Sequence, residues 1–173
     1  MSQELLSSDE FDLEDFGERF HIAWNTRDVE GLVGLLTEDI IWIDPSRPAP
    51  VIGRDGVRDF LNASIHAFPD LRFQEKTDPP HRIIVGNQVS WAWVMEGTML
   101  GDLNPPGFAP TGRSFSVEGV DVWGLRDGKI GHYRTFYDLA YVGRQLGLLP
   151  EIGSKAERGT VALQRFGARF RRK

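Results

Sequence analysis

The chain has 173 residues, of which 40% are hydrophobic and 26% are charged, and its formal net charge at pH 7 is −5. Eleven Phe, five Trp and three Tyr exclude disorder as the main state, and no apolar run approaches the roughly 20 residues that span a bilayer. An acidic chain without cysteine argues against nucleic-acid binding, disulfides and thiolate metal sites. Residues 1–18 contain no Lys or Arg, unlike a signal peptide. We therefore expect a cytoplasmic globular protein with neither nucleic acid nor membrane as a partner.

Three helices are predicted in the first part of the chain. Apolar residues recur at helical spacing in the first of them, as Phe16, Phe20 and Trp24 show. Asp28 suits the N-cap of the second helix, and Pro69 follows the end of the third. The expected helical ranges are 12–25, 29–36 and 54–68.

The remaining pattern indicates strands. Residues 40–43 form a short β-branched strand that ends at Asp44-Pro45, and a Gly/Pro-rich loop is expected over 100–112. Asp127-Gly128 predicts a tight hairpin turn. The further expected strands are 71–76, 82–85, 88–99, 114–125 and 129–139, before a closing helix over 140–148. The fold class is therefore α+β, with three N-terminal helices packed in a curved antiparallel sheet of mixed strand order and a short C-terminal helix.

The ends of the chain differ in charge from its middle. We expect an acidic segment over 1–11, one domain over 12–152 and a basic tail over 153–173. The tail is interpreted as solvated or self-docking, or alternatively as attracted to an anionic surface. Residues 91–99 and 115–125 carry large apolar groups on both strand faces, which predicts a homodimer that packs its sheets together.

Four short runs resemble the NTF2-like superfamily, and within it the SnoaL-like (polyketide cyclase) branch. The runs are Ala23-Trp24-Asn25 followed by Asp28-Val29-Glu30-Gly31, Ala67-Phe68-Pro69-Asp70-Leu71-Arg72, Ala109-Pro110-Thr111-Gly112-Arg113 and Gln145-Leu146-Gly147-Leu148. The similarity covers roughly residues 12–150. It implies a cone in which a curved sheet wraps around the helices and encloses a hydrophobic cavity for a small molecule.

The site residues that the resemblance implies match only in part. Cyclases of this branch and the related limonene-epoxide hydrolases use a carboxylate on the last strand, where this chain has Thr135. The Arg and Asp of those hydrolases fall at Trp93 and Met95, which argues against epoxide hydrolysis. The steroid-isomerase branch matches better. Its basic Asp before a Pro resembles Asp44, and its protonated Asp aligns with Asp121, although its Tyr donor falls at Phe20.

The two carboxyls suggest a division of chemical roles. Asp121 lies within an apolar strand, and burial in a cavity would raise its pKa so that it donates a hydrogen bond while Asp44 accepts a proton, as in ketosteroid isomerase. Tyr133 and Thr135 share strand parity and would supply hydroxyls. Two alternatives remain open: Asp44 caps the loop that follows it, or Asp121 faces the other way and pairs with Arg134.

Large apolar side chains are expected to form the walls of the substrate site, although such a stripe is also typical of a core. The expected wall residues are Trp24, Trp42, Phe60, Trp91, Trp93 and Met95, with Thr135 contributing a hydroxyl. No His pair has metal-ligand spacing and no Gly-rich phosphate loop occurs, so neither a metal nor a cofactor is expected.

Two functions follow from these patterns. The first is an enzyme that transfers a proton next to a carbonyl, in the cyclisation, isomerisation or dehydration of a hydrophobic polyketide- or steroid-like substrate. The Asp44 and Asp121 pair favours it. The alternative is a non-catalytic ligand-binding or interaction domain, which Thr135 in place of the last-strand Asp favours.

Overall fold

The computed structural model describes residues 13–76 and 82–170, so the acidic segment expected over 1–11 lies outside the described residues. Among the helices of that part, none is both long and apolar enough to cross a membrane. The helices are α1 (Leu13–Thr26), α2 (Val29–Gly34), α3 (Gly53–Ala67), α4 (Leu139–Gln145) and α5 (Lys155–Phe170). The strands are β1 (Leu36–Ile43), β2 (Val51–Ile52), β3 (Arg72–Glu75), β4 (Arg82–Val85), β5 (Gln88–Thr98), β6 (Ser114–Arg126) and β7 (Lys129–Tyr137).

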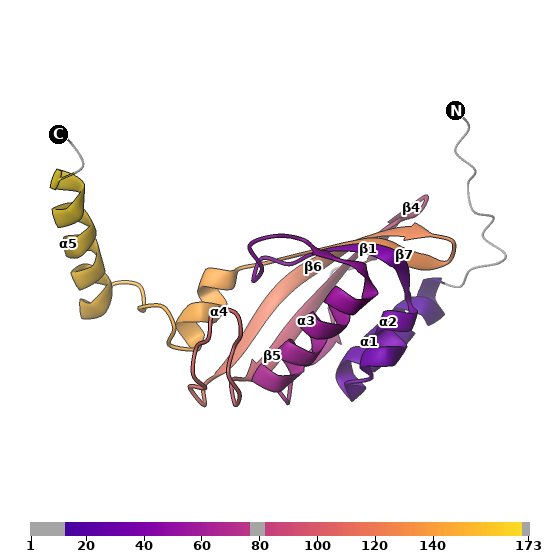
Figure 1. Ribbon diagram of the computed structural model, residues 1–173, viewed down its shortest axis with the longest axis horizontal. Coiled ribbons are helices and arrows are strands. Elements are labelled where there is room, and N and C mark those ends of the chain that lie inside the picture. Colours follow the sequence, from indigo (N-terminus) through magenta and orange to yellow (C-terminus); the bar gives the residue numbers. More distant parts are fainter. Residues whose placement is uncertain (1–12, 77–81, 171–173) are drawn as a thin grey trace.

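The strands form one open, curved sheet with the order β2-β1-β7-β6-β5-β3, and β4 pairs with β5 (Figure 1). The expected α+β class is confirmed. The expectation of an antiparallel sheet is wrong at one place, because β1 and β7 run parallel, with Trp42 opposite Tyr133. The sheet is therefore mixed. This parallel pair joins the first strand of the chain to the last, and so brings the end of β1 beside β7.

The helices α1, α2 and α3 lie against one face of the sheet (Figure 1). They do not form one N-terminal block, because β1 and β2 intervene between α2 and α3. The first strand also begins earlier than expected, at Leu36. The polar run 37–39 had indicated a break, but Leu36 is fully buried and pairs with Ile130 across the sheet. Asp28 caps α2 as predicted, accepting a hydrogen bond from the Gly31 backbone N–H.

Aromatic side chains fill the space between the helices and the sheet. Trp42, Trp91, Trp93 and Trp123 are each almost completely buried. Trp91 lies over Gly17 of α1, where a Cβ atom would come within 1.9 Å of its ring, so a larger residue would displace the indole. The packing divides the interior into a filled end around Trp91 and Trp123 and a hollow end around Trp93.

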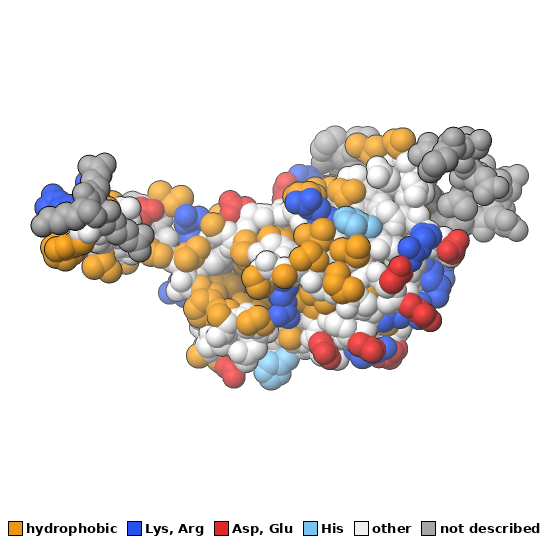
Figure 2. Space-filling model, turned by 45° about the horizontal axis from the view of Figure 1, so that its top comes forward, with side chains coloured by type: hydrophobic (Ala, Val, Ile, Leu, Met, Phe, Trp, Pro, Cys, Tyr) orange, Lys and Arg blue, Asp and Glu red, His pale blue; other side chains and the backbone are white. Residues whose placement is uncertain are grey.

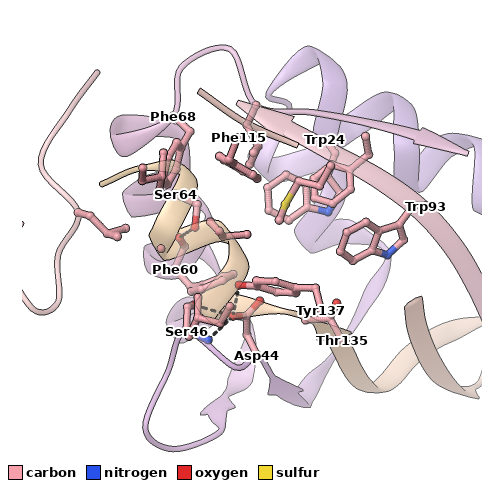
Figure 3. Close-up of a pocket in the computed structure, with 18 of the residues that line it drawn as sticks. Trp24, Asp44, Ser46, Phe60, Ser64, Phe68, Trp93, Phe115, Thr135 and Tyr137 are labelled. Atoms are coloured by element: carbon pink, nitrogen blue, oxygen red, sulfur yellow. Dashed lines mark hydrogen bonds between the residues drawn. The ribbon is translucent and has the colours of Figure 1, made fainter. Parts of the chain in front are cut away.

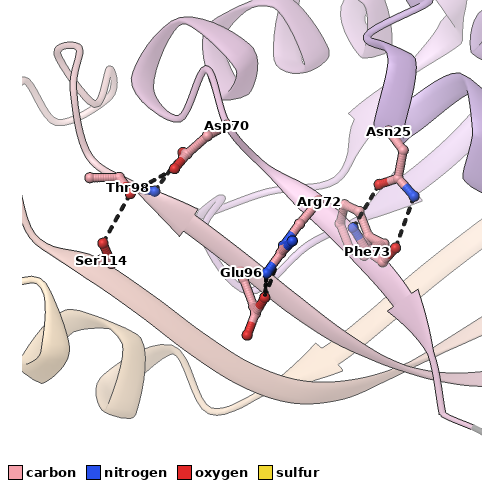
Figure 4. A network of polar contacts seen from close by, with 7 residues as sticks. All are labelled: Asn25, Asp70, Arg72, Phe73, Glu96, Thr98 and Ser114. Atoms are coloured by element: carbon pink, nitrogen blue, oxygen red, sulfur yellow. Dashed lines mark hydrogen bonds and ion pairs between the residues drawn. The ribbon is translucent and has the colours of Figure 1, made fainter.

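Polar side chains fasten the edge of the sheet to the helices (Figure 4). The Asn25 side chain at the end of α1 donates to the Phe73 carbonyl and accepts from the Phe73 N–H, at 2.9 and 2.8 Å. Asp70 accepts hydrogen bonds from both the backbone and the hydroxyl of Thr98. These bonds satisfy backbone groups of edge strand β3 and of the end of β5 that lack a strand partner. They also hold the rim of the hollow end in place.

The C-terminal region differs from the expected tail, because residues 155–170 form the helix α5. Its start is locally encoded: the Ser154 hydroxyl accepts from the Glu157 N–H at 3.0 Å, in the manner of a capping box. None of its residues is buried, and it stands apart from the domain (Figure 1). Hydrophobic and basic side chains both lie on its surface, at the far left of Figure 2. The exposed apolar residues are Val161, Leu163, Phe166 and Phe170.

Removal of residues 154–173 is expected to change the midpoint of thermal unfolding by no more than about 2 °C, because α5 buries no side chain against the domain. Differential scanning calorimetry of the full and shortened chains would measure this. The substitution Val57→Ala in the core is the control that should lower the midpoint clearly, since Val57 is fully buried. A large drop on truncation would show instead that the tail docks on the folded domain.

Candidate active site

The hollow end of the cone holds an inner chamber of about 120 Å³ (Figure 3). It lies between α3, α4 and the inward faces of β1, β5, β6 and β7. Apolar and aromatic side chains form most of its wall, and a few polar groups gather at one place, where β1 ends beside β7. The polar members of the wall are Asp44, Ser46, Ser64, Tyr133, Thr135 and Tyr137.

Asp44 is fixed at this place through one of its carboxylate oxygens. Oδ1 accepts hydrogen bonds from the Ser46 N–H at 2.8 Å, the Ser46 hydroxyl at 2.5 Å and the Tyr137 hydroxyl at 3.2 Å (Figure 3). Within the described residues Oδ2 accepts no hydrogen bond. Asp44 therefore caps the loop through Oδ1, as one interpretation of the sequence expected. Oδ2 has no partner there, as the role of a base would require.

Asp121 lies in β6 directly opposite Thr135, and only 1% of its surface is exposed. Burial raises its pKa to about 7, and the negative charge of Asp44 adds to this effect. Polar hydrogens of Trp93, Thr135 and Tyr133 face the carboxyl and limit the rise of the pKa. Even so, Asp121 Oδ1, Trp93 Nε1 and Thr135 Oγ1 make no hydrogen bond within the described residues. These three atoms form a buried polar cluster whose hydrogen-bond donors and acceptors have no partner within the described residues.

Arg134 is not the partner of Asp121. Its guanidinium lies 4.7 Å from the centre of the Phe136 ring, and Phe136 is 45% exposed on the outer face of the sheet. Successive residues of a strand point to opposite faces, so Thr135 points inward with Asp121 and Arg134 points outward. The alternative in which Arg134 neutralises Asp121 is therefore wrong.

The two tyrosines of β7 are hydrogen-bond donors among the polar residues of the wall, where β1 ends beside β7. Tyr133 stacks on Trp42 with ring centres 3.6 Å apart, and burial together with the nearby Asp121 raises its pKa well above the usual value. Burial and Asp44 likewise raise the pKa of Tyr137. Both hydroxyls therefore keep their protons near neutral pH. Tyr133, Thr135 and Tyr137 share strand parity, which is why all three reach the chamber.

Most of the residues that the sequence indicated lie around this chamber. The wall includes Trp24, Trp42, Asp44, Phe60, Trp93, Met95, Tyr133 and Thr135. Asp121 lies one layer behind the wall, next to Trp93 and Thr135. Trp91 does not reach the chamber, because its ring packs between Gly17, His21 and Trp123 at the filled end.

Three polar members of the wall were not anticipated: Ser46, Ser64 and Tyr137. Tyr137 has the same strand parity as Tyr133 and Thr135, so the alternation of β7 could have indicated it. Ser46 follows Asp44-Pro45, and an Asp two residues before a Ser is a common turn pattern in which the carboxylate accepts the backbone N–H. Within the described ranges, no three His, Asp or Glu side chains gather closely enough to hold a metal ion.

Comparison with known proteins identifies the family and the fold of the chain. The SnoaL-like domain family matches residues 17–133. No curated protein matches the chain. The candidate polyketide cyclase IdmH from Streptomyces antibioticus is 25% identical, with a TM-score of 0.60 over 78% of this chain and 97% of IdmH.

Two further solved structures share the fold at lower identity. A candidate SnoaL-like polyketide cyclase from Jannaschia sp. CCS1 is 21% identical, with a TM-score of 0.68 over 79% of this chain and 92% of its own. A protein with a ketosteroid isomerase-like fold from Catenulispora acidiphila is 17% identical, with a TM-score of 0.63 over 77% of this chain and 92% of its own. With the family match over 17–133, these results show that the chain belongs to the SnoaL-like domain family, on an NTF2-like fold.

Proposed function

We propose that the protein is an enzyme that transfers a proton next to the carbonyl group of a hydrophobic, polyketide- or steroid-like substrate, without a cofactor. The observation that carries this proposal is a pair of carboxyls in contrasting environments, one in the wall of an apolar chamber and one buried behind that wall. Asp44 is anchored and open at Oδ2, whereas Asp121 is buried with its pKa raised to about 7. Two titratable groups with separated proton affinities are typical of acid–base sites.

In the proposed reaction Asp44 Oδ2 removes the proton from the carbon next to the carbonyl. Negative charge then develops on the carbonyl oxygen, which Tyr133 and Thr135 stabilise as hydrogen-bond donors. Asp121, protonated and behind them, supplies a further donor to the same cluster. Donors placed where charge develops contribute a few kcal/mol to transition-state stabilisation. The apolar wall excludes water, which strengthens each of these interactions.

The proposal can be tested before the natural substrate is known. Cyclic and aromatic ketones would be incubated with the protein in D₂O, and the loss of the proton next to the carbonyl would be followed by NMR. Exchange that is faster than in buffer and in a mutant at Asp44 supports the proposal. A ligand that binds without any exchange would favour the alternative, a binding domain that kept the cone without the chemistry.

We also propose that two copies pack through the outer face of the sheet. Val120 lies between Ala92 and Phe136 across three strands, and Phe136 and Ile41 are 45% and 40% exposed. A row of apolar groups on an exposed sheet face is typical of an interface. No described residue of α1, α2 or α3 covers this face, because those helices lie on the other side (Figure 1).

The variant Phe136→Lys is expected to weaken this homodimer at least about tenfold, since it places a charge in the apolar row. Light scattering after size-exclusion chromatography, over a series of concentrations, would measure the mass. Ile22→Lys on α1 is a matched control, because Ile22 is also exposed, at 51%, but lies on a helix at the opposite face of the sheet. A wild-type chain that stays monomeric at micromolar concentration would contradict the proposal.

A further inference from the structure

An outer chamber of about 240 Å³ adjoins the inner chamber. The wall of the outer chamber comes from the loop after β1, from α3, from the loop over 100–112 and from the region of α4. The two chambers share lining residues, so they adjoin each other. The shared residues are Ser46, Phe60, Ser64, Leu103, Leu139, Gly143 and Leu148. A ligand longer than the inner chamber would therefore extend past Phe60 into the outer one.

Arg47 supplies the only basic side chain in the described wall of both chambers, just as Asp44 supplies the only acidic one. The Arg47 N–H donates to the Asp44 carbonyl at 3.0 Å, which fixes the turn between them. The guanidinium carbon lies 5.0 Å from the centre of the Phe60 ring. Phe60 is itself 93% buried in the wall, so it holds the guanidinium at the passage between the chambers.

The guanidinium of Arg47 is unused within the described residues. Arg58, Arg72 and Arg126 each pair with a carboxylate, and Arg54 donates to the Leu36 carbonyl. No such ion pair or side-chain hydrogen bond occurs at Arg47. A half-buried guanidinium that lies on an aromatic ring in the wall of a cavity is suited to a planar anion.

We propose that Arg47 binds a carboxylate of the substrate, at the end opposite the carbonyl that lies near Asp44. This inference rests on the proposed function, because it assumes that the reacting carbonyl occupies the inner chamber. The rest of the outer wall is mostly apolar, with residues such as Pro105, Pro106 and Phe108. A singly charged carboxylate is matched by one guanidinium, whereas a phosphate would need further donors. The substrate class is therefore a hydrophobic keto acid.

The test uses two probes that differ in charge and by one methyl group: 6-acetyl-2-naphthoate and its methyl ester. Binding to the full chain is measured by isothermal titration calorimetry at low and at high salt. The wild-type protein is expected to bind the acid at least about tenfold more tightly than the ester, and added salt should reduce this preference. Arg47→Gln should abolish the preference and leave the affinity for the ester within about twofold. Arg47→Lys should restore part of it.

Arg134→Gln is the matched control, because Arg134 also lies over a Phe ring but on the outer face of the sheet. It should leave both affinities unchanged. The proposal is overturned if the wild-type chain binds the acid and the ester equally, if it binds neither, or if Arg134→Gln acts as strongly as Arg47→Gln. Binding requires no turnover, so an acid preference that depends on Arg47 in a protein without proton exchange would refute the proposed reaction alone.

Discussion

Asp44→Asn is expected to lower the rate of proton exchange next to a ketone by about 10²–10⁴-fold, the usual effect of losing a general base. The amide oxygen of Asn can still accept the hydrogen bonds that Ser46 and Tyr137 donate to Oδ1. The variant should therefore fold normally and bind ketones with an affinity close to that of the wild type. Exchange followed by NMR, with ligand affinity measured in parallel, separates the chemical effect from the structural one.

Asp102→Asn is the control for this experiment. Asp102 is an exposed carboxylate in the loop over 100–112, and it does not line the inner or the outer chamber. Its replacement removes the same charge but leaves the polar residues of the chamber wall unchanged, so exchange should continue at the wild-type rate. If Asp44→Asn exchanges as fast as the wild type, Asp44 is not the base, and the binding domain becomes the better account of the cone.

The sequence runs that resemble the family contain residues that stabilise the fold. Asn25 clamps the edge strand β3, and Asp28 caps α2. Gln145 makes a similar clamp, accepting from the Ser116 N–H and donating to the Ser116 carbonyl, both at 3.0 Å, which attaches α4 to β6. Asp28 could be recognised from the sequence alone because a helix N-cap is a local requirement. Asn25 and Gln145 bond to residues 48 and 29 positions away, so only the resemblance to the family indicated them. All three stabilise the fold and therefore contain little information about the reaction.

The site was harder to predict because it depends on side-chain packing across the sheet. Strand parity grouped Tyr133 with Thr135 but left the face of Asp121 open, and parity does not distinguish the wall of a cavity from the layer behind it. Trp91 and Trp93 have the same parity on β5, yet only Trp93 reaches the chamber. The difference arises from Gly17, which admits the Trp91 ring between α1 and the sheet. No local pattern in the sequence indicates that contact.

The environment of Asp121 predicts a second large effect, on the pH dependence of stability. The folded protein holds the Asp121 proton up to a pKa of about 7, whereas an unfolded chain releases such a proton near pH 4. Its contribution to the free energy of unfolding is therefore complete below about pH 4 and is lost as the pH rises to about 7. The loss amounts to at most about 4 kcal/mol.

Asp121→Asn has no titrating carboxyl at this position, so its free energy of unfolding should not fall between pH 4 and pH 7 for this reason. Relative to the wild type, its free energy of unfolding in urea is expected to rise by about 2–4 kcal/mol between pH 4 and pH 8. Asp59→Asn, at an exposed position on α3, should run parallel to the wild type over the same range. A constant difference between Asp121→Asn and the wild type would show that Asp121 releases its proton in the folded state as easily as in the unfolded state.

The same variants distinguish a donor from a packing residue in the reaction. If protonated Asp121 supports the hydroxyls of Tyr133 and Thr135, proton exchange by the wild type should fall as the pH rises through about 7. Asp121→Asn keeps a donor at this position at every pH, so it should lose this fall. It should also slow exchange less than Asp121→Ala, which removes the donor at position 121 and costs a few kcal/mol of stabilisation. Equal rates for the Asn and Ala variants would assign Asp121 to packing, and exchange would then depend on Asp44, Tyr133 and Thr135 alone.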